Sequence, residues 1–212
     1  MKHRATLTTD TIETFQYPAF VPLVSDAFET LKCLPQGFLI QRCLFILNQG
    51  EHPPFIYLLR GGLVKLVYLN PDGRETMLGL RATGWYAGAA SSLTHTVSTY
   101  SVKTITPCLF SKIAASDFSL RLAQSARLTR HFVNSLCKEL SCQTAEAERK
   151  NDSAENRLEQ LMAERNIEHG DIRTLDPLPM LKQKELAHLL SITPEHLSRV
   201  LHKIQTPPAC RL

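Results

Sequence analysis

The sequence predicts an α+β protein in three consecutive parts, and three observations along the chain support this. Short β-rich runs separated by turns extend from about Pro35 to Ile113, a segment without Gly or Pro runs from Phe118 to about Arg149, and two short amphipathic patterns lie near the end. Alternating β-branched runs indicate strands, whereas apolar residues at three- and four-residue spacing indicate helices. We therefore expect an N-terminal β domain over residues 1–117, a long helix over 118–150 and a small helical domain over 151–212.

The first part has the pattern of a small antiparallel barrel or sandwich. The runs LVKLVYL and RETMLGL flank Pro71-Asp72-Gly73, which combines a preset φ, a side chain that caps turns and a residue that readily takes positive φ. These features predict a β-hairpin. A later run, SVKTITPCLFSKI, is rich in β-branched residues, and its Pro107 limits it to a sheet edge or a strand end.

The second part predicts one long helix. Its apolar residues recur at helical spacing and are Leu122, Leu128, Phe132, Leu136 and Leu140. At 1.5 Å per residue this helix would be on the order of 45 Å long, which exceeds one small domain. It therefore either crosses between domains or pairs with another copy of itself.

The end of the chain predicts two short helices joined by a turn at Ser191 to Thr193. In the second helix Thr193 can act as the N-cap and Pro194 suits the first helical position. Its apolar stripe is Leu197, Val200, Leu201 and Ile204, and its opposite face carries Glu195, Ser198, Arg199 and His202. This layout fits a helix-turn-helix, and equally a corner between two helices of any helical domain.

Composition places the chain among ordinary globular proteins, with 43% hydrophobic and 21% charged residues. A net charge of +4 and a pI of about 8.8 permit an anionic partner without demanding one. There is neither an apolar run of membrane-spanning length nor an apolar signal core, so we expect no membrane span and a cytoplasmic location. The six cysteines lack a C-x-x-C spacing, and no catalytic motif is present, so we expect neither a metal site nor an enzyme.

In this order, the features resemble the Crp/Fnr family of bacterial transcription regulators. The residues that carry the resemblance are LFILNQGEHPPFIYLLRGGLVKLVYLNPDGRETMLGLRATGWYAGAASSL, the long helix, NRLEQLM and KELAHLLSITPEHLSRVLHKI. The resemblance implies an antiparallel, jelly-roll-like β-roll of the cyclic nucleotide-binding type that senses an effector. It further implies a dimerisation helix and a C-terminal helix-turn-helix that binds DNA.

The resemblance also implies which residues contact DNA. In the Fnr-like branch, a Glu followed three and four residues later by Ser and Arg contacts bases, and Glu195, Ser198 and Arg199 stand at those positions. Arg suits the O6 and N7 atoms of guanine and Glu can accept from the cytosine amine, each contact contributing about 1–3 kcal/mol of discrimination. A simple surface pair between Glu195 and Arg199 remains the alternative. The expected phosphate contacts are Lys182, Lys184, His196, His202 and Lys203.

The predicted effector pocket departs from that of the cyclic-AMP-binding members. Ala89 stands where a Glu holds the ribose, and Ser98 and Thr99 stand where an Arg and a Ser hold the phosphate. A buried phosphate without a cationic partner is costly, so cyclic AMP is not expected as the effector. A hydrophobic or gaseous effector, a haem held by His52, His95 or His131, or no ligand all remain open. The predicted pocket residues are Tyr86, Gly88, Ala89, Ala90, Leu93, Ser98, Thr99 and Tyr100.

The resemblance implies a homodimer that reads a palindromic operator in double-stranded DNA. The two copies would pair through Leu122, Leu128, Phe132, Leu136 and Leu140 and hold their recognition helices about 34 Å apart. RNA polymerase is left open as a further partner. One departure is that the family continues into a hairpin wing, whereas here TPPACRL follows the last helix. A shortened or missing wing is expected, which leaves open a ligand- or partner-binding module that has lost DNA binding.

Overall fold

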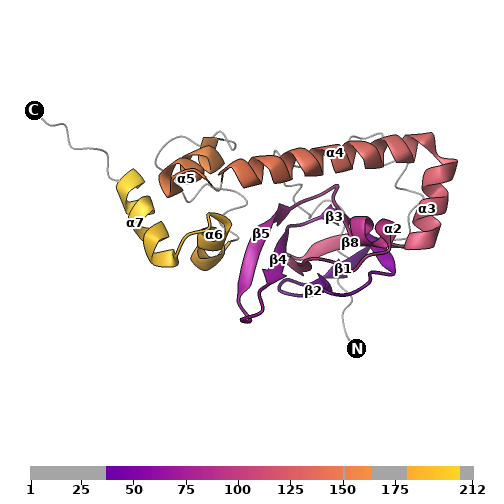
Figure 1. Cartoon of the computed structure of the whole chain (residues 1–212), viewed down its shortest axis with the longest axis horizontal. Coiled ribbons are helices and arrows are strands. Elements are labelled where there is room, and N and C mark those ends of the chain that lie inside the picture. Colours follow the sequence, from indigo (N-terminus) through magenta and orange to yellow (C-terminus); the bar gives the residue numbers. More distant parts are fainter. Residues whose placement is uncertain (1–36, 150, 164–180, 206–212) are drawn as a thin grey trace, which may run out of the picture.

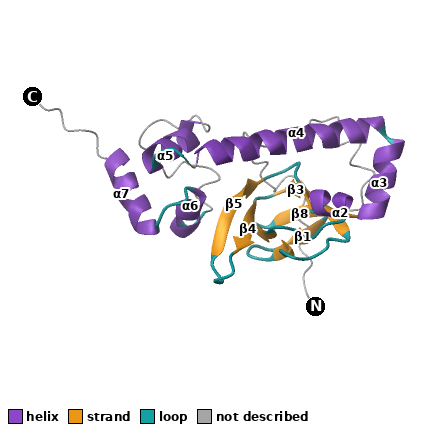
Figure 2. Ribbon diagram, viewed as in Figure 1, coloured by secondary structure: helices purple, strands orange, loops and turns teal. Residues whose placement is uncertain are grey.

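The structure, a computed structural model, describes residues 37–149, 151–163 and 181–205. The strands come first, with the short α2 (Ala89–Thr94) among them, and the helices follow, of which α4 (Ala126–Arg149) is the longest of the described chain (Figure 1, Figure 2). The predicted α+β class with antiparallel sheets is confirmed. The expected shortened wing falls on residues 206–212, outside the described residues. Among the described residues, we find no helix with the length and apolar content that crossing a bilayer requires.

The strands of the described chain form two four-stranded antiparallel sheets. One sheet has the order β1 (Phe38–Ile40), β8 (Cys108–Ala114), β3 (Phe55–Gly61) and β6 (Tyr86–Ala87). The other has the order β2 (Phe45–Leu47), β7 (Ser101–Thr104), β4 (Val64–Leu69) and β5 (Glu75–Arg81). Leu59 and Phe110 of the first sheet and Leu66 of the second belong to one buried cluster. The two sheets therefore share a core, and we call this unit the β-roll.

The hairpin predicted at residues 71–73 is present between β4 and β5. The backbone N–H of Asn70 donates to the carbonyl of Arg74 at 2.9 Å, and the Asp72 carboxylate accepts from the Arg74 N–H at 3.1 Å. Gly73 has a φ of 80°, a conformation that other residues adopt only with strain. The turn residues thus fix the register of the two strands.

The run from Ser101 to Ile113 is two strands rather than one. β7 lies between β2 and β4 in one sheet, and β8 lies between β1 and β3 in the other. Pro107 sits between the two strands, just before β8 begins. Its missing N–H therefore removes no bond from either ladder, and the chain changes sheets at this point.

The prediction of one uninterrupted helix from Phe118 to Arg149 is wrong. The structure has α3 (Ala115–Gln124) and α4 (Ala126–Arg149), separated by Ser125 in an extended conformation with φ −130° and ψ 98°. The Ser125 hydroxyl accepts from the backbone N–H of Leu128 at 3.2 Å and so caps α4. Ser is a favoured N-cap residue, and this signal could have located the break. Beyond it, α4 runs alongside the β-roll (Figure 1).

The last helices are α5 (Ala154–Ala163), α6 (Gln183–Leu189) and α7 (Pro194–Gln205). The predicted start of α7 is confirmed, since the Thr193 hydroxyl accepts from the backbone N–H of His196 at 3.2 Å. Between α6 and α7, Ser191 has a positive φ of 55°, which ends α6 in a left-handed cap. Leu197 and Val200 of α7 are buried. They belong to the same buried cluster as the β-roll core, so α6 and α7 pack in continuity with the sheets.

Candidate effector and nucleic-acid sites

Helix α7 presents the three predicted base-contacting side chains to solvent. Glu195, Ser198 and Arg199 are all exposed, whereas Leu197 and Val200 face inward. Hydrogen bonding by its own backbone N–H and by Thr193, together with the nearby Arg199 charge, lowers the pKa of Glu195. At neutral pH this face therefore offers one carboxylate acceptor and one guanidinium donor, side by side on a single helix.

The predicted phosphate contacts fall into two groups. His202 and Lys203 are exposed near the end of α7, and His196 is half-buried at its start. The Lys203 ammonium lies 3.4 Å from a carboxylate oxygen of Glu155 in α5.

Lys182 and Lys184 lie elsewhere, at the start of α6 and opposite the β4–β5 hairpin. The five predicted contacts thus come from the start of α6 and from α7, and their binding to phosphate stays a prediction.

An ion pair anchors α6 to the β-roll. The Lys65 ammonium of β4 lies 2.9 Å from the Glu185 carboxylate, and the two side chains are only 13% and 22% exposed. The second carboxylate oxygen of Glu185 accepts from the backbone N–H of Lys182 at 3.1 Å. Burial by itself raises the pKa of Glu185, but the bonds from Lys65 and Lys182 outweigh it, and the net pKa is lowered. Sequence reasoning missed this contact because the residues lie 120 positions apart.

The eight residues predicted as one effector pocket lie in separate surroundings. Tyr86, Ala89 and Leu93 pack in the cluster that α3 and α4 cover, and Gly88 is the N-cap of α2 (Ala89–Thr94). Ala90 and Thr99 are exposed.

The remaining two residues of the prediction lie in the segment after α2. Ser98 is buried, and its hydroxyl donates to the Tyr100 carbonyl at 2.7 Å, while Tyr100 packs against the cluster at the centre of the β-roll. The structure thus does not gather all eight side chains around one space.

Several buried polar side-chain atoms of the β-roll and of α4 have no hydrogen-bond partner. In the part of the chain that the structure describes, they include Thr83 Oγ1 and Tyr86 Oη from the roll and His131 Nε2 and Glu139 Oε2 from α4. Most buried polar atoms in proteins are hydrogen-bonded, so such atoms indicate a place where water or a ligand binds. Burial raises the pKa of Tyr86 and lowers that of His131, so both side chains are neutral at pH 7.

The residues present do not fit a haem. His52 and His95 are exposed. His131 faces the ring of Tyr86, with centroids 6.2 Å apart, and the rings of Tyr86, Phe118 and Phe132 pack 5.1–5.7 Å from one another. These rings occupy the space that a porphyrin would need beside His131. The described residues also contain no group of three or more His, Cys, Asp or Glu side chains that could hold a metal ion.

Some of the apolar residues predicted to form the dimer interface are instead buried within the chain. Leu128 and Phe132 are only 4% and 5% exposed, and Phe132 packs on Phe118 with ring centroids 5.1 Å apart. The prediction that they face a partner is therefore wrong, because their surface is already covered. Leu122 is half-buried.

The exposed apolar side chains of α4 form a different stripe. They are Val133, Leu136 and Leu140, which are 48%, 43% and 66% exposed. Their spacing of three and four residues places them on one face of the helix. Leu136 and Leu140 of the predicted dimer interface lie on this exposed stripe. Val133 lies on it too, although it was not predicted.

Comparison with known families bears on the β-roll. Residues 43–125 match the family model described as the cyclic nucleotide-binding domain. The β-roll has the cyclic nucleotide-binding fold. The match begins just before β2 and ends at Ser125, so it contains every strand of the two sheets except β1. No curated protein matches the sequence.

Several solved structures superpose on this chain over most of its length, including the β-roll and the helices that follow it. The c-di-GMP-responsive global regulator CLP of Xanthomonas campestris superposes with a TM-score of 0.67 and 20% identity, covering 85% of this chain and 90% of that one. A CRP-family transcriptional regulator of Thermus thermophilus has a TM-score of 0.62 and 20% identity, covering 79% and 84%. A CRP/FNR-family regulator of the same organism has a TM-score of 0.63 and 18% identity, covering 80% and 85%. At these identities the likeness concerns the fold.

Proposed function

We propose that this protein is an effector-responsive transcription regulator of the Crp/Fnr type that reads a palindromic operator as a homodimer. The observation that carries the proposal is the exposed face of α7, with Glu195, Ser198 and Arg199 together, on a chain whose β-roll has the cyclic nucleotide-binding fold. The structural relatives described as transcriptional regulators support it. A regulator of this kind works in the compartment that holds DNA, so we propose a cytoplasmic location.

In this proposal α6 and α7 form a helix-turn-helix, and α7 enters the major groove. The Arg199 guanidinium would donate two hydrogen bonds to one guanine, and Glu195 would accept from a cytosine amine. Ser198 lies between them on the same exposed face. The trio follows the Fnr-like pattern, which we propose for base recognition here.

We propose that the effector binds between the β-roll and α4, near Thr83, Tyr86, His131 and Glu139. The polar atoms left without partners there would be satisfied by a small ligand that both donates and accepts hydrogen bonds. This site favours a polar effector, whereas the sequence leaves a hydrophobic or gaseous effector, a haem or no ligand open. Cyclic AMP remains unexpected, because the Ser98 hydroxyl is engaged by the Tyr100 carbonyl and Ala89 offers no acceptor.

The effector would act by shifting α4, which carries both the partner surface and the connection to α5. A ligand that binds one position of α4 better than another changes the population of the two positions and so the spacing of the two recognition helices. We propose that Val133, Leu136 and Leu140 meet the same residues of a second copy. RNA polymerase stays open as a further partner.

Selection from a random pool of DNA duplexes tests the proposed function. The purified full chain should enrich sequences with inverted half-sites about 10 base pairs apart, centre to centre. Lys138→Ala, an exposed change on α4 away from the α7 face, serves as the matched control and should enrich the same sequences. If no sequence is enriched at low salt, the proposal fails and a ligand- or partner-binding module without DNA binding is favoured.

A calorimetric titration with cyclic AMP tests the effector expectation separately. No binding heat is expected, since no cation stands at the predicted phosphate position. Micromolar affinity for cyclic AMP would contradict it.

A further inference from the structure

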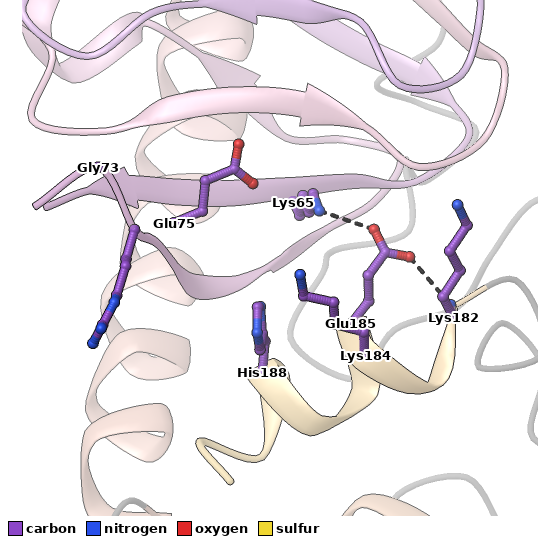
Figure 3. Close-up of a pocket in the computed structure, with 8 residues that line it drawn as sticks. Lys65, Gly73, Glu75, Lys182, Lys184, Glu185 and His188 are labelled. Carbon is purple, nitrogen blue, oxygen red and sulfur yellow. Dashed lines mark hydrogen bonds and ion pairs between the residues drawn. The ribbon is translucent and has the colours of Figure 1, made fainter. Parts of the chain in front are cut away.

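The ion pairs that α6 and α7 make with their neighbours differ in their exposure to water. Glu185 of α6 lies 2.9 Å from Lys65 of β4, and these side chains are only 22% and 13% exposed (Figure 3). The Lys203 ammonium of α7 lies 3.4 Å from a carboxylate oxygen of Glu155, and these side chains are 74% and 34% exposed. The pair on α7 can therefore exchange a partner with an ion from solution, whereas the pair on α6 is enclosed.

Helix α5, which carries Glu155, packs on α7 (Figure 1). Ala154 and Leu158 of α5 belong to the same buried cluster as Leu197 and Val200 of α7. Glu155 directly follows Ala154 in the first turn of α5. The apolar packing between the two helices therefore fixes the carboxylate beside α7.

The Glu155 carboxylate lies against the side of α7 that carries its cations. His196, Arg199 and Lys203 follow one another at three- and four-residue spacing, which places them on one side of the helix. A hydrogen bond from its own backbone N–H, the bond from Lys203 and the charge of nearby His196 lower the pKa of Glu155. The carboxylate is therefore ionised at neutral pH, and its charge lies beside the surface proposed to meet DNA.

A DNA phosphate would meet the ammonium that Glu155 already holds. Phosphate and carboxylate oxygens accept the same charge-assisted hydrogen bonds from an ammonium group. A carboxylate that stays beside the phosphate also repels it, because both carry negative charge. A duplex must therefore displace Glu155 from Lys203 or accept this repulsion, and either effect weakens binding. Neither effect depends on the base sequence.

We propose that Glu155 competes with DNA phosphates for Lys203 and thereby lowers the affinity of α7 for every duplex, without changing which bases are preferred. This inference rests on the proposed function, in which α7 enters the major groove. Affinity differences within one interface act mainly through the dissociation rate, so the protein would leave nonspecific sites sooner.

A fluorescence anisotropy titration of the full chain with a random-sequence duplex at low ionic strength tests the competition. Glu155→Gln keeps the shape of the side chain and removes its charge. We expect binding to become roughly two- to fivefold tighter for each α7 that contacts the duplex, the range that exposed ion pairs support. The gain should shrink as salt is added, because ions screen the charges.

Glu159→Gln is the matched control, since it removes the same charge from the same helix. Glu159 is exposed one turn further along α5 and has no contact with Lys203 among the described side chains. Glu159→Gln should therefore tighten duplex binding less than Glu155→Gln does. Equal tightening by the two changes would overturn the proposal, because a general charge effect would then explain both.

A double-mutant cycle tests the contact itself. Lys203→Ala should weaken duplex binding more in the Glu155→Gln background than in the wild type, because there the lysine has no carboxylate to leave. The same loss in both backgrounds would also overturn the proposal.

Failure of the competition can be distinguished from failure of the proposed function. If an operator is enriched but Glu155→Gln binds random duplexes like the wild type, only the competition is wrong. If Glu155→Gln binds random duplexes more tightly but no sequence is enriched, the competition stands and sequence reading fails. Absence of binding to any duplex in every variant would overturn both.

Discussion

Arg81 of β5 and Glu139 of α4 form an ion pair that joins the β-roll to the long helix. The guanidinium Nε and Nη2 atoms lie 3.0 and 2.6 Å from one carboxylate oxygen, and the Arg81 side chain is only 1% exposed. A third nitrogen, Nη1, donates to the Leu80 carbonyl at 2.7 Å. The pair lies beside the proposed effector site. One oxygen of the Glu139 carboxylate holds α4 on the β-roll, and the second oxygen has no hydrogen-bond partner.

Removing one member of this pair should destabilise the protein strongly. Glu139→Ala removes the carboxylate that accepts two hydrogen bonds from the buried Arg81 guanidinium, and we expect the free energy of unfolding to fall by about 3–5 kcal/mol in urea titrations. The double variant Arg81→Met with Glu139→Leu buries no charge and should recover much of this loss. A loss below about 1 kcal/mol in Glu139→Ala would show that the pair does not hold α4 on the roll.

The exposed stripe on α4 should control the oligomeric state. Leu140→Glu places a charge on the most exposed of the three apolar residues, at 66%. Burial of one Leu is worth about 1.5–3 kcal/mol, so the dimer dissociation constant should rise by roughly 100-fold or more in sedimentation velocity. Leu120→Glu on α3, where Leu120 is 57% exposed, is the matched control and should leave the dimer intact. Equal effects of the two changes would contradict the proposed seam.

Arg199 and Lys203 of α7 should differ in what they contribute to DNA binding. Arg199→Ala should remove about 1–3 kcal/mol of discrimination at one base position of each half-site, because a base contact is lost. Lys203→Ala should weaken all sequences alike and reduce the salt dependence by about one counterion per helix. Mobility-shift titrations at several salt concentrations separate these outcomes. An Arg199→Ala variant with full sequence preference would be incompatible with base recognition by this residue.

Cys108 should resist thiol reagents in the folded protein. Burial raises the pKa of its thiol from 9.0 to about 11, although bonds with Thr106 and Leu63 oppose the shift. The thiolate is the reactive form, so at pH 8.5 the exposed Cys43 and Cys137 should be alkylated well before Cys108. Mass spectrometry of peptides from native and urea-unfolded protein measures the order.

The same shift predicts a stability change at high pH. In the unfolded chain the thiol ionises near its ordinary pKa of 9.0, whereas in the folded chain it stays neutral until about 11. Unfolding should therefore become easier as the pH rises between these values, and Cys108→Ser, which does not ionise there, should lose this dependence. Alkylation of native Cys108 as fast as Cys137 would contradict both expectations.

Local patterns in the sequence were sufficient where a structure depends on neighbouring residues. The hairpin at Gly73 and the start of α7 at Pro194 follow from turn and cap chemistry within a few residues, and both are present. The outward face of α7 also follows from its 3.6-residue period. The break at Ser125 has a local signal too, a capping hydroxyl, but the absence of Gly and Pro around it favoured a single helix.

Only the tertiary structure decided which apolar side chains pack inside the chain and which charged side chains form ion pairs within it. By itself the sequence determined the order of strands and helices and the exposed trio Glu195, Ser198 and Arg199, because these depend on local periodicity. It could not separate Phe132, which packs inside the chain, from Leu136, which does not, since both fit one helical stripe. Nor could it pair Arg81 with Glu139, because contacts between residues 58 positions apart depend on how the helix packs on the sheets.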